Sequence, residues 1–228
     1  MWKANILTLL PNAYPGLLGM SVVGRALSKK IWDINLVDIK KFSCKNNKVD
    51  DPPFGGGPGM VLRPDVLDRA ISSVPDNDLP KYYLSPRGEK FDQEMAIKLS
   101  KQRGGTFICG RYEGIDQRFI DHHGLIEISV GDYILSGGDL ALMVILDTVI
   151  RLIPGVIGNK DGLLEETFSN DLLEYPLYTQ PREWKNLKVP EILLSGNHNK
   201  IKDWKIKQSE SITKKKRPDF WKKYLKSM

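Results

Sequence analysis

The segment "GLIEISVGDYILSGGDLALMVILDTVIRLIPG", residues 124–155, decides the fold of this chain. Its first part, residues 124–135, is rich in apolar and β-branched residues and predicts a strand. Its second part, residues 137–155, is strongly apolar and predicts one buried helix that ends at Pro154-Gly155. The segment therefore predicts a strand, a glycine-containing loop and a helix in direct succession.

The same alternation of strands and helices precedes this segment. Strands that alternate with helices form a mostly parallel sheet, so the sequence predicts an α/β fold. After Gly158 turn-forming residues and then lysines dominate, which predicts a first domain at residues 1–158, a linker at 159–175 and a small helical domain at 176–228. The other expected elements are strands at residues 4–11, 31–39, 81–86 and 105–110, and helices at residues 63–74 and 92–102.

The composition indicates a globular protein with a polyanionic partner. Of 228 residues, 41% are hydrophobic and 27% are charged, which excludes a disordered or collagen-like chain. The net charge is +6 and the isoelectric point is near 9.1. Between Ser195 and Met228, eleven cationic side chains outnumber three anionic ones, a net charge of +8. Aromatic residues interleave with these cations, which favours RNA or DNA binding over a merely solvated helix face.

The cysteines and the hydropathy pattern indicate the cellular compartment of the protein. Cys44 and Cys109 lie far apart without the spacing of metal ligands, which argues for a reducing compartment and against a disulfide framework or a zinc site. The chain starts without a secretory leader, and its longest apolar stretch, residues 140–150, is too short to span a membrane. The sequence therefore predicts a cytoplasmic protein with no membrane segment and no assigned metal ligands.

Glycine-containing loops carry the chemical signal of the first domain. Residues 83–93, 109–121 and 130–141 each follow or contain a predicted strand and break into a loop. Ligands of parallel α/β sheets bind at the carboxyl ends of strands, so the three loops can line one pocket, although each alone is equally compatible with a tight turn. Neither of the standard glycine-rich nucleotide motifs is present. A fourth stretch, "DDPPFGGGPGM" at residues 50–60, is an irregular loop that is either a spacer or a site.

Six motifs in colinear order identify a family. Between Trp2 and about Trp204 the chain closely resembles the bacterial tRNA (guanine-N1)-methyltransferases, which are SPOUT-class enzymes. The resemblance implies a deep trefoil knot, a homodimer, S-adenosylmethionine as cofactor, with Mg²⁺ as a candidate second one, and the guanosine at position 37 of tRNA as substrate. The motifs that carry it are "VDDPPFGGGPGM", "YLSPRG", "CGRYEGIDQR", "GDYILSGGDLA", "RLIPGVIG" and "LLEYPLYTQP".

The resemblance also assigns residues to the cofactor. Glycines let backbone donors and acceptors approach adenine and ribose, and a carboxylate can accept hydrogen bonds from the methionyl ammonium or the ribose hydroxyls. The carboxylate expected in this role is Glu113. By similarity the cofactor residues are Tyr83, Leu84, Ser85, Pro86 and Gly88 in the first loop, Gly110, Tyr112, Glu113 and Gly114 in the second, and Val130, Gly131, Tyr133, Leu135, Gly137 and Gly138 in the third.

Methylation of guanine N1 needs a base for the N1 proton and a cation near O6. By similarity Arg151 is the cation; without the family it reads as a cation favoured at a helix C-terminus. The family has an aspartate as base, and the matching residue here is Glu166, with Asp171 as the alternative. Glutamate is one methylene longer and has nearly the same reference pKa, so it can serve the same chemistry.

The remaining expectations concern the substrate. By resemblance the loop at residues 50–60 is a substrate site in which Asp50 contacts the target guanosine or its neighbour. Lys214, Lys215 and Lys216 are expected to contact tRNA phosphates. The alternative function is a noncatalytic RNA-binding protein of the same fold, which binding of S-adenosylmethionine would argue against.

Overall fold

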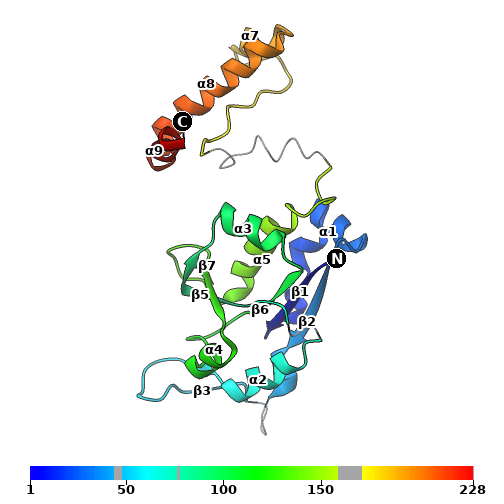
Figure 1. The fold of residues 1–228 in the computed structure, drawn as a ribbon, viewed down its shortest axis with the longest axis vertical. Coiled ribbons are helices and arrows are strands. Elements are labelled where there is room, and N and C mark those ends of the chain that lie inside the picture. Colours follow the sequence, from blue (N-terminus) through cyan, green and yellow to red (C-terminus); the bar gives the residue numbers. More distant parts are fainter. Residues whose placement is uncertain (44–47, 76–77, 159–170, 228) are drawn as a thin grey trace. The chain divides into compact units, whose positions relative to one another are not determined.

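The computed structural model describes residues 1–43, 48–75, 78–158 and 171–227 of the chain. The chain forms two compact units, Met1–Gly158 and Asn159–Met228. In the first unit the elements follow one another as β1 (Trp2–Thr8), η1 (Pro11–Ala13), η2 (Gly16–Gly19), α1 (Ser21–Ser28), β2 (Trp32–Asp38), η3 (Ile39–Phe42), β3 (Asp50–Asp51), β4 (Val61–Leu62), α2 (Pro64–Ser72), β5 (Lys81–Lys90), α3 (Gln93–Ser100), β6 (Gly104–Ile108), α4 (Gln117–His123), β7 (Ile126–Ser129) and α5 (Gly138–Ile150) (Figure 1).

Five strands form one parallel sheet in the order β2-β1-β6-β5-β7. The mostly parallel α/β fold expected from the sequence is therefore confirmed. The strands alternate between two faces, as neighbouring residues of a strand must. Ile6 and Phe107 point to one core cluster, whereas their neighbours Leu7 and Ile108 point to the other.

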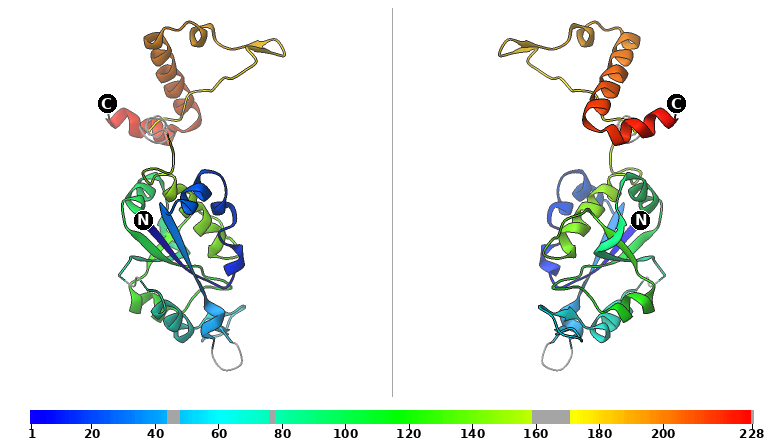
Figure 2. Two further views of the ribbon diagram at one scale, coloured as in Figure 1. Left: turned by 90° about the vertical axis from the view of Figure 1, so that its right-hand side faces the viewer. Right: turned by 90° about the vertical axis from the view of Figure 1, so that its left-hand side faces the viewer.

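Helices cover both faces of the sheet, as the two side views show (Figure 2). The first cluster holds buried residues of α1, α3 and α5, and the second holds buried residues of α2 and α4. Helix α5 is the most apolar of these helices, and Leu142, Ile145 and Leu146 in it are fully buried. Packing against the parallel sheet accounts for the apolar residues on the buried side of α5.

Side-chain caps fix the starts of two helices. The Asp92 carboxylate accepts a hydrogen bond from the Met95 backbone N–H (2.9 Å) and starts α3, as the sequence predicts. Asp116 caps α4 in the same way through the Arg118 N–H (2.9 Å). The Arg118 side chain also bonds to Asp116, and this contact holds the pKa of the carboxyl below its usual range.

Element boundaries differ from the sequence prediction in specific places. The strand expected at residues 124–135 ends at Ser129, because the backbone at Gly131 turns to φ +152° and residues 130–135 form a loop. The strand expected at residues 81–86 continues to Lys90 as β5, and the long helix ends at Ile150. The short helices α1 and α4 were not predicted.

The second unit contains a hairpin of β8 (Glu183–Trp184) and β9 (Leu187–Lys188), then α7 (Glu191–Leu194), α8 (His198–Lys216) and α9 (Pro218–Ser227). The segment after Asp171 packs on α8: the Leu173 N–H donates to the Thr213 hydroxyl (2.8 Å), and the Lys205 ammonium lies 4.4 Å from the Tyr175 ring centroid. Within the described residues, no helix is both long enough and apolar enough to cross a membrane.

Candidate active site

A pocket of about 240 Å³ lies where three chain segments meet at one edge of the sheet. The segments are the middle of β5, the residues that follow β6 and the loop between β7 and α5. They meet because β5 lies between β6 and β7 and all three strands run in parallel, which brings their carboxyl ends together. Every residue that the resemblance assigns to the cofactor, except Gly88, lines this pocket.

The first segment is a bulge in β5. Strand β5 pairs with Ile128 of β7 twice, first through Leu84 and again through Glu89, so the residues between them leave the ladder. The Ser85 hydroxyl accepts a hydrogen bond from the Arg87 backbone N–H (3.2 Å) within the bulge. The bulge presents Ser85 to the pocket from a rigid strand.

Gly88 lies in this bulge but is placed against β7 and not at the pocket. A Cβ atom at this position would lie 2.3 Å from the backbone carbon of Glu127 and 2.3 Å from the backbone nitrogen of Ile128. The absence of a side chain therefore allows β5 to approach β7 closely. Gly88 does not line the pocket, and its assignment to the cofactor stays a prediction.

We expect Gly88→Ala to lower the free energy of unfolding by about 1–3 kcal/mol, because the added methyl group forces two paired strands apart. Urea denaturation of the purified protein measures the change. Gly158→Ala is the matched control, since a Cβ there meets no atom within 4 Å. Equal stability of the two variants would show that β5 can yield at the bulge without cost.

The second segment, residues 110–114, is a tight turn after β6. The Gly114 N–H donates to the Arg111 carbonyl (3.1 Å), and Tyr112 takes the left-handed backbone conformation with φ +58°. This conformation is uncommon for a residue with a side chain and is often retained at ligand sites. Among the described residues that line the pocket, Glu113 is the only one with a carboxylate.

The third segment joins the second through the start of α5. The Gly138 N–H donates to the Gly110 carbonyl (2.9 Å). A Cβ atom on Gly138 would lie 3.0 Å from the Cα of Cys109 and 3.1 Å from the Cβ of Leu84. Residue 138 must therefore be small for all three segments to meet at the pocket.

A buried polar cluster lies next to the pocket. The Asp139 carboxylate is 5% exposed, and its Oδ1 accepts hydrogen bonds from the hydroxyls of Thr8 (2.6 Å) and Tyr14 (3.2 Å). Burial, with the Asp139 charge as a second cause, raises the pKa of the Cys109 thiol well above its usual range. The thiol therefore stays protonated and does not act as a nucleophile.

The glycine-rich loop between β3 and β4 extends from the body of the first unit (Figure 1). Backbone hydrogen bonds attach the end of this loop to a segment of the pocket. The Glu113 N–H donates to the Met60 carbonyl (2.9 Å), and the Leu62 N–H donates to the Gly114 carbonyl (3.0 Å). These bonds connect the end of the loop to the second pocket segment.

The structure does not bring Asp50 to the pocket. Asp50 is half-buried in β3, opposite Leu62. Its neighbour Asp51 lines a second pocket of about 920 Å³ and forms ion pairs with Arg63 (2.5 Å) and Lys48 (3.3 Å). The hydrogen bonds from Arg63 first, and from Lys48 second, hold the pKa of Asp51 below its usual range.

Arg151 follows the last residue of α5, whereas Gly138 at the pocket is its first residue. At a rise of about 1.5 Å per residue, this helix separates the two by roughly 20 Å. Arg151 is therefore not brought to the pocket of its own chain.

The two candidate bases both lie in the predicted linker at residues 159–175. Glu166 lies outside the described residues. Asp171 is half-buried in the second unit and takes the left-handed conformation with φ +55°. It stands two residues before Leu173, whose N–H is bonded to α8.

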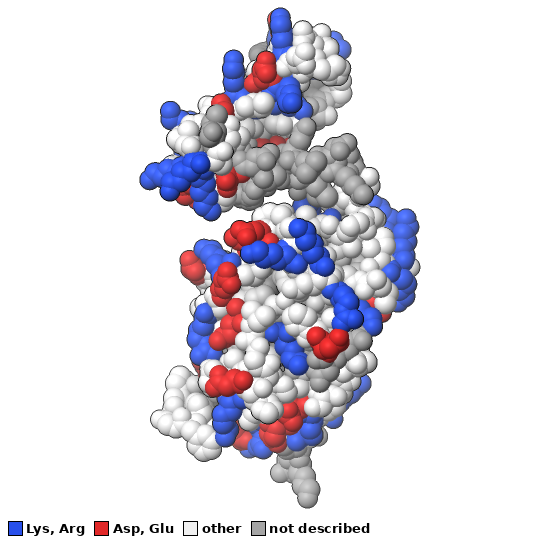
Figure 3. All heavy atoms as spheres, viewed as in Figure 1, with Lys and Arg blue, Asp and Glu red and all other residues white. Residues whose placement is uncertain are grey.

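Lys214, Lys215 and Lys216 form the last turn of α8, and all three are exposed. Cations are favoured at the C-terminal end of a helix. Lys and Arg side chains (blue) gather on the visible face of α8 and α9 (Figure 3). The basic surface expected from the sequence is thus carried by these two helices in the second unit.

Several pocket residues were missed by sequence reasoning. Ser129 is buried at the end of β7, and its hydroxyl lies 3.3 Å from the Gly131 backbone N–H that bonds to it. The sequence offered one signal for Ser129, namely its position directly before the glycine-containing loop. Arg111, Ile134 and Ala141 lie in the loops predicted to line the pocket but were not singled out, and Ile128 lies in the strand before the third loop.

A parallel sheet with a pocket at its strand ends, lined by glycine-rich segments, is typical of α/β proteins that bind a small ligand. The comparisons with known proteins specify the class. Residues 2–223 match the family model described as tRNA (Guanine-1)-methyltransferase TrmD. The chain belongs to this family, so the resemblance inferred from its motifs is confirmed and the protein is an enzyme.

Three relatives illustrate how complete the similarity is. All three are named tRNA (guanine-N(1)-)-methyltransferase. The protein of Pelagibacter ubique is 48% identical over 228 residues, which is the full length of both chains. That of Rhodospirillum rubrum is 50% identical over 98% of this chain and 94% of its own, and that of Wolbachia pipientis is 49% identical over 96% and 94%.

The pocket fits the methyl donor that a methyltransferase of this family implies. Gly110, Gly137 and Gly138 offer only backbone atoms to a ligand. Glu113 can accept hydrogen bonds from an ammonium group or from ribose hydroxyls. The exposed ring of Tyr133, with 56% of its surface accessible, provides an apolar wall. These features suit an adenosine that carries a charged amino acid.

Proposed function

We propose that this enzyme transfers the methyl group of S-adenosylmethionine to N1 of the guanosine at position 37 of tRNA. The observation that carries the proposal is the pocket built from residues of three predicted cofactor loops, with a single carboxylate, in a chain of the tRNA (Guanine-1)-methyltransferase family. The bound cofactor supplies a methyl group on a positively charged sulfonium.

The reaction needs two further groups from the protein. A carboxylate, Glu166 or else Asp171, takes the proton from N1, and the electron pair of N1 becomes the nucleophile that accepts the methyl group. The Arg151 guanidinium stabilises the negative charge that develops on O6. The carboxylate keeps the proton from N1. After transfer of the methyl group, the remaining S-adenosylhomocysteine carries a neutral thioether sulfur.

We propose that two chains share each site. Arg151 lies at the far end of α5 from the pocket of its own chain, which supports its supply by a second copy. The exposed side of α5 supports such pairing: Leu140 and Val144 lie one turn apart and are 58% and 52% exposed. Leu17 in the adjoining η2 is 78% exposed, which extends the apolar surface. Apolar patches of this kind mark protein interfaces.

We also propose the trefoil knot that the family resemblance implies. Its support is the path of the chain after β7, since Gly138 packs directly against Cys109, which follows β6. The start of α5 thus contacts the segment that follows β6, which comes earlier in the sequence.

The glycine-rich loop and the basic helices are proposed to bind tRNA. The hydrogen bonds between Glu113 and Met60 and between Leu62 and Gly114 support a role for this loop near the cofactor segments. In this proposal Asp50 lies outside the cofactor pocket and contacts the target guanosine or its neighbour. The Mg²⁺ dependence, the separate linker at residues 159–175 and the cytoplasmic location stay predictions.

We expect that replacing Lys214, Lys215 and Lys216 together by alanine weakens tRNA binding and reduces the slope of log K against log salt by up to about 2.7, at roughly 0.9 per lost phosphate contact. Filter binding at several salt concentrations measures this slope. Lys98→Ala in α3 with Lys101→Ala directly after it, in the first unit, is the control. An unchanged slope in the triple variant would remove these lysines from the tRNA contact.

Methylation of two tRNA transcripts tests the proposed function directly. One transcript has guanosine at position 37 and the other has adenosine there. We expect 1-methylguanosine in the digest of the first and no methylated nucleoside from the second. If the protein binds RNA but does not bind S-adenosylmethionine, and no methylated nucleoside forms, it is instead the noncatalytic alternative.

A further inference from the structure

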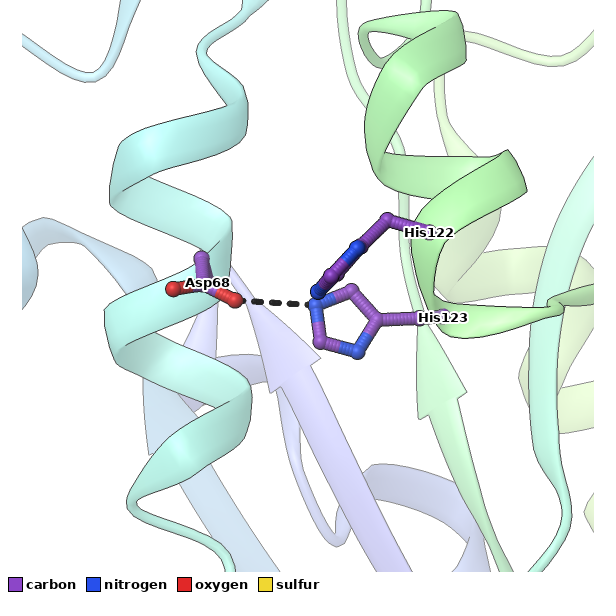
Figure 4. A group of neighbouring side chains, drawn as sticks. All are labelled: Asp68, His122 and His123. Carbon is purple, nitrogen blue, oxygen red and sulfur yellow. Dashed lines mark hydrogen bonds and ion pairs between the residues drawn. The ribbon is translucent and has the colours of Figure 1, made fainter.

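Two histidines and one aspartate outside the pocket come together between α2 and α4. His122 and His123 are the last two residues of α4, and Asp68 lies on α2. Figure 4 shows Asp68 pointing across the gap between the helices towards both imidazole rings. The spacing of the cysteines predicts no zinc site, and the adjacent histidines form no metal-binding motif in the sequence.

The ligand atoms of the three residues converge. One nitrogen of each imidazole and one carboxylate oxygen lie within 4.8 Å of one another. His123 Nε2 lies 2.9 Å from Asp68 Oδ1. The side chains of His123 and Asp68 are 15% and 54% exposed, so the cluster is reachable from solvent on one side.

Packing holds both helices and the rings in place. Leu67 of α2 and Phe119 of α4 are buried in the same core cluster. The Phe119 ring lies 4.6 Å from the His123 ring, and the His122 ring meets that of His123 edge-on at 4.9 Å. The ligand atoms therefore lie on two packed helices and not on mobile loops.

The surrounding charges are balanced. A depression of about 380 Å³ beside the cluster is also lined by Asp65 and Arg118. Arg118 donates two side-chain hydrogen bonds to Asp116 (2.9 and 2.8 Å), which offsets its charge. The end of α4 directly after His123 adds the negative end of a helix dipole.

We propose that Asp68, His122 and His123 bind one divalent cation of the zinc class. Metal–ligand distances of about 2.0–2.2 Å in a tetrahedron place neighbouring ligand atoms about 3.4 Å apart, within small side-chain movements of the observed separations. Three protein ligands leave the fourth position to water. Two imidazoles favour Zn²⁺ or Co²⁺ over Mg²⁺, which prefers oxygen ligands.

The bound cation links α2 to α4 and thereby restrains the loops that precede these two helices. Helix α2 begins at Pro64, soon after the glycine-rich loop, and α4 begins at Gln117, soon after the second pocket segment. A link between the two helices restrains both loops at their bases. The site is distinct from methyl transfer, and its test does not depend on that activity.

Titration of the untagged, chelator-treated chain with CoCl₂ alone tests the proposal. We expect one Co²⁺ per chain with the intense visible absorption of tetrahedral cobalt, displaced by Zn²⁺. Asp68→Asn and His122→Gln should each weaken binding at least about 10-fold, because loss even of an outer-shell partner costs 10- to 100-fold. His198→Gln, which changes the remaining histidine of the chain, should bind as the wild type does.

Thermal unfolding separates a metal site from a simple helix–helix hydrogen bond. Zn²⁺ should raise the melting temperature of the wild type and of His198→Gln but not that of Asp68→Asn, since only binding to the folded state stabilises. Asparagine keeps a hydrogen-bonding group towards His123, so the metal-free variant should melt close to the wild type. Absence of binding at 100 µM metal, or equal binding in all variants, would overturn the proposal.

Discussion

Glu166→Gln is expected to slow methylation at saturating substrates by roughly 10²- to 10⁴-fold, while cofactor affinity stays nearly unchanged. The amide preserves the shape of the side chain but cannot take the N1 proton. Glu166→Asp should be the mildest change, because it shortens the carboxylate without removing it. Single-turnover methylation of a guanosine-37 transcript measures the rate, and titration measures cofactor binding.

Asp171→Asn is the paired control for this assignment. Guanine N1 is itself a weak acid, so a variant that lacks the base should regain rate as the pH rises. A variant that only misplaces the linker should stay slow at every pH. Wild-type rates in Glu166→Gln together with slow rates in Asp171→Asn would transfer the role to Asp171, the residue anchored near α8.

Val144→Glu is expected to convert the proposed dimer into monomers and to reduce methylation at least about 100-fold, because one chain alone does not join Arg151 to the pocket. The Val144 side chain is 52% exposed, so the substitution should leave the fold of one chain intact. Light scattering gives the mass. Ile97→Glu, at a position of α3 that is 39% exposed, places the same charge elsewhere and should change neither property.

Complementation tests the shared site more directly. Arg151→Ala removes the cation, and Leu135→Trp fills the pocket, so each variant alone should be inactive. Mixed dimers would contain one intact site each, and an equal mixture should recover about one quarter of the wild-type sites. Recovery of no activity, with mixed dimers present, would show that Arg151 serves its own chain.

The parallel α/β sheet followed from alternating strands and helices, and the pocket followed from three glycine loops at strand ends. Exact boundaries did not follow. Tyr133 and Ile134 have the composition of a strand, but the backbone turns at Gly131 and leaves them exposed. Gly88 belongs to a cofactor motif by sequence, yet only the distance to β7 reveals its packing role.

Contacts between distant segments could not be read from local patterns. The approach of Asp68 to His123 depends on how α2 packs on α4, and α4 itself has too few residues for a clear helical period. The separation of Arg151 from the pocket depends on the course of α5. The order of the motifs identified the family, and membership of a family implies its fold and therefore contacts of this kind.

The glycines of the pocket have a consequence for inhibition. Gly110, Gly114, Gly131, Gly137 and Gly138 offer a bound molecule nothing but main chain. Mutation can add atoms at these positions but cannot delete a contact. A competitive drug that makes its hydrogen bonds to this main chain would leave bacteria few routes to resistance, because bulk that excludes the drug also excludes the natural cofactor.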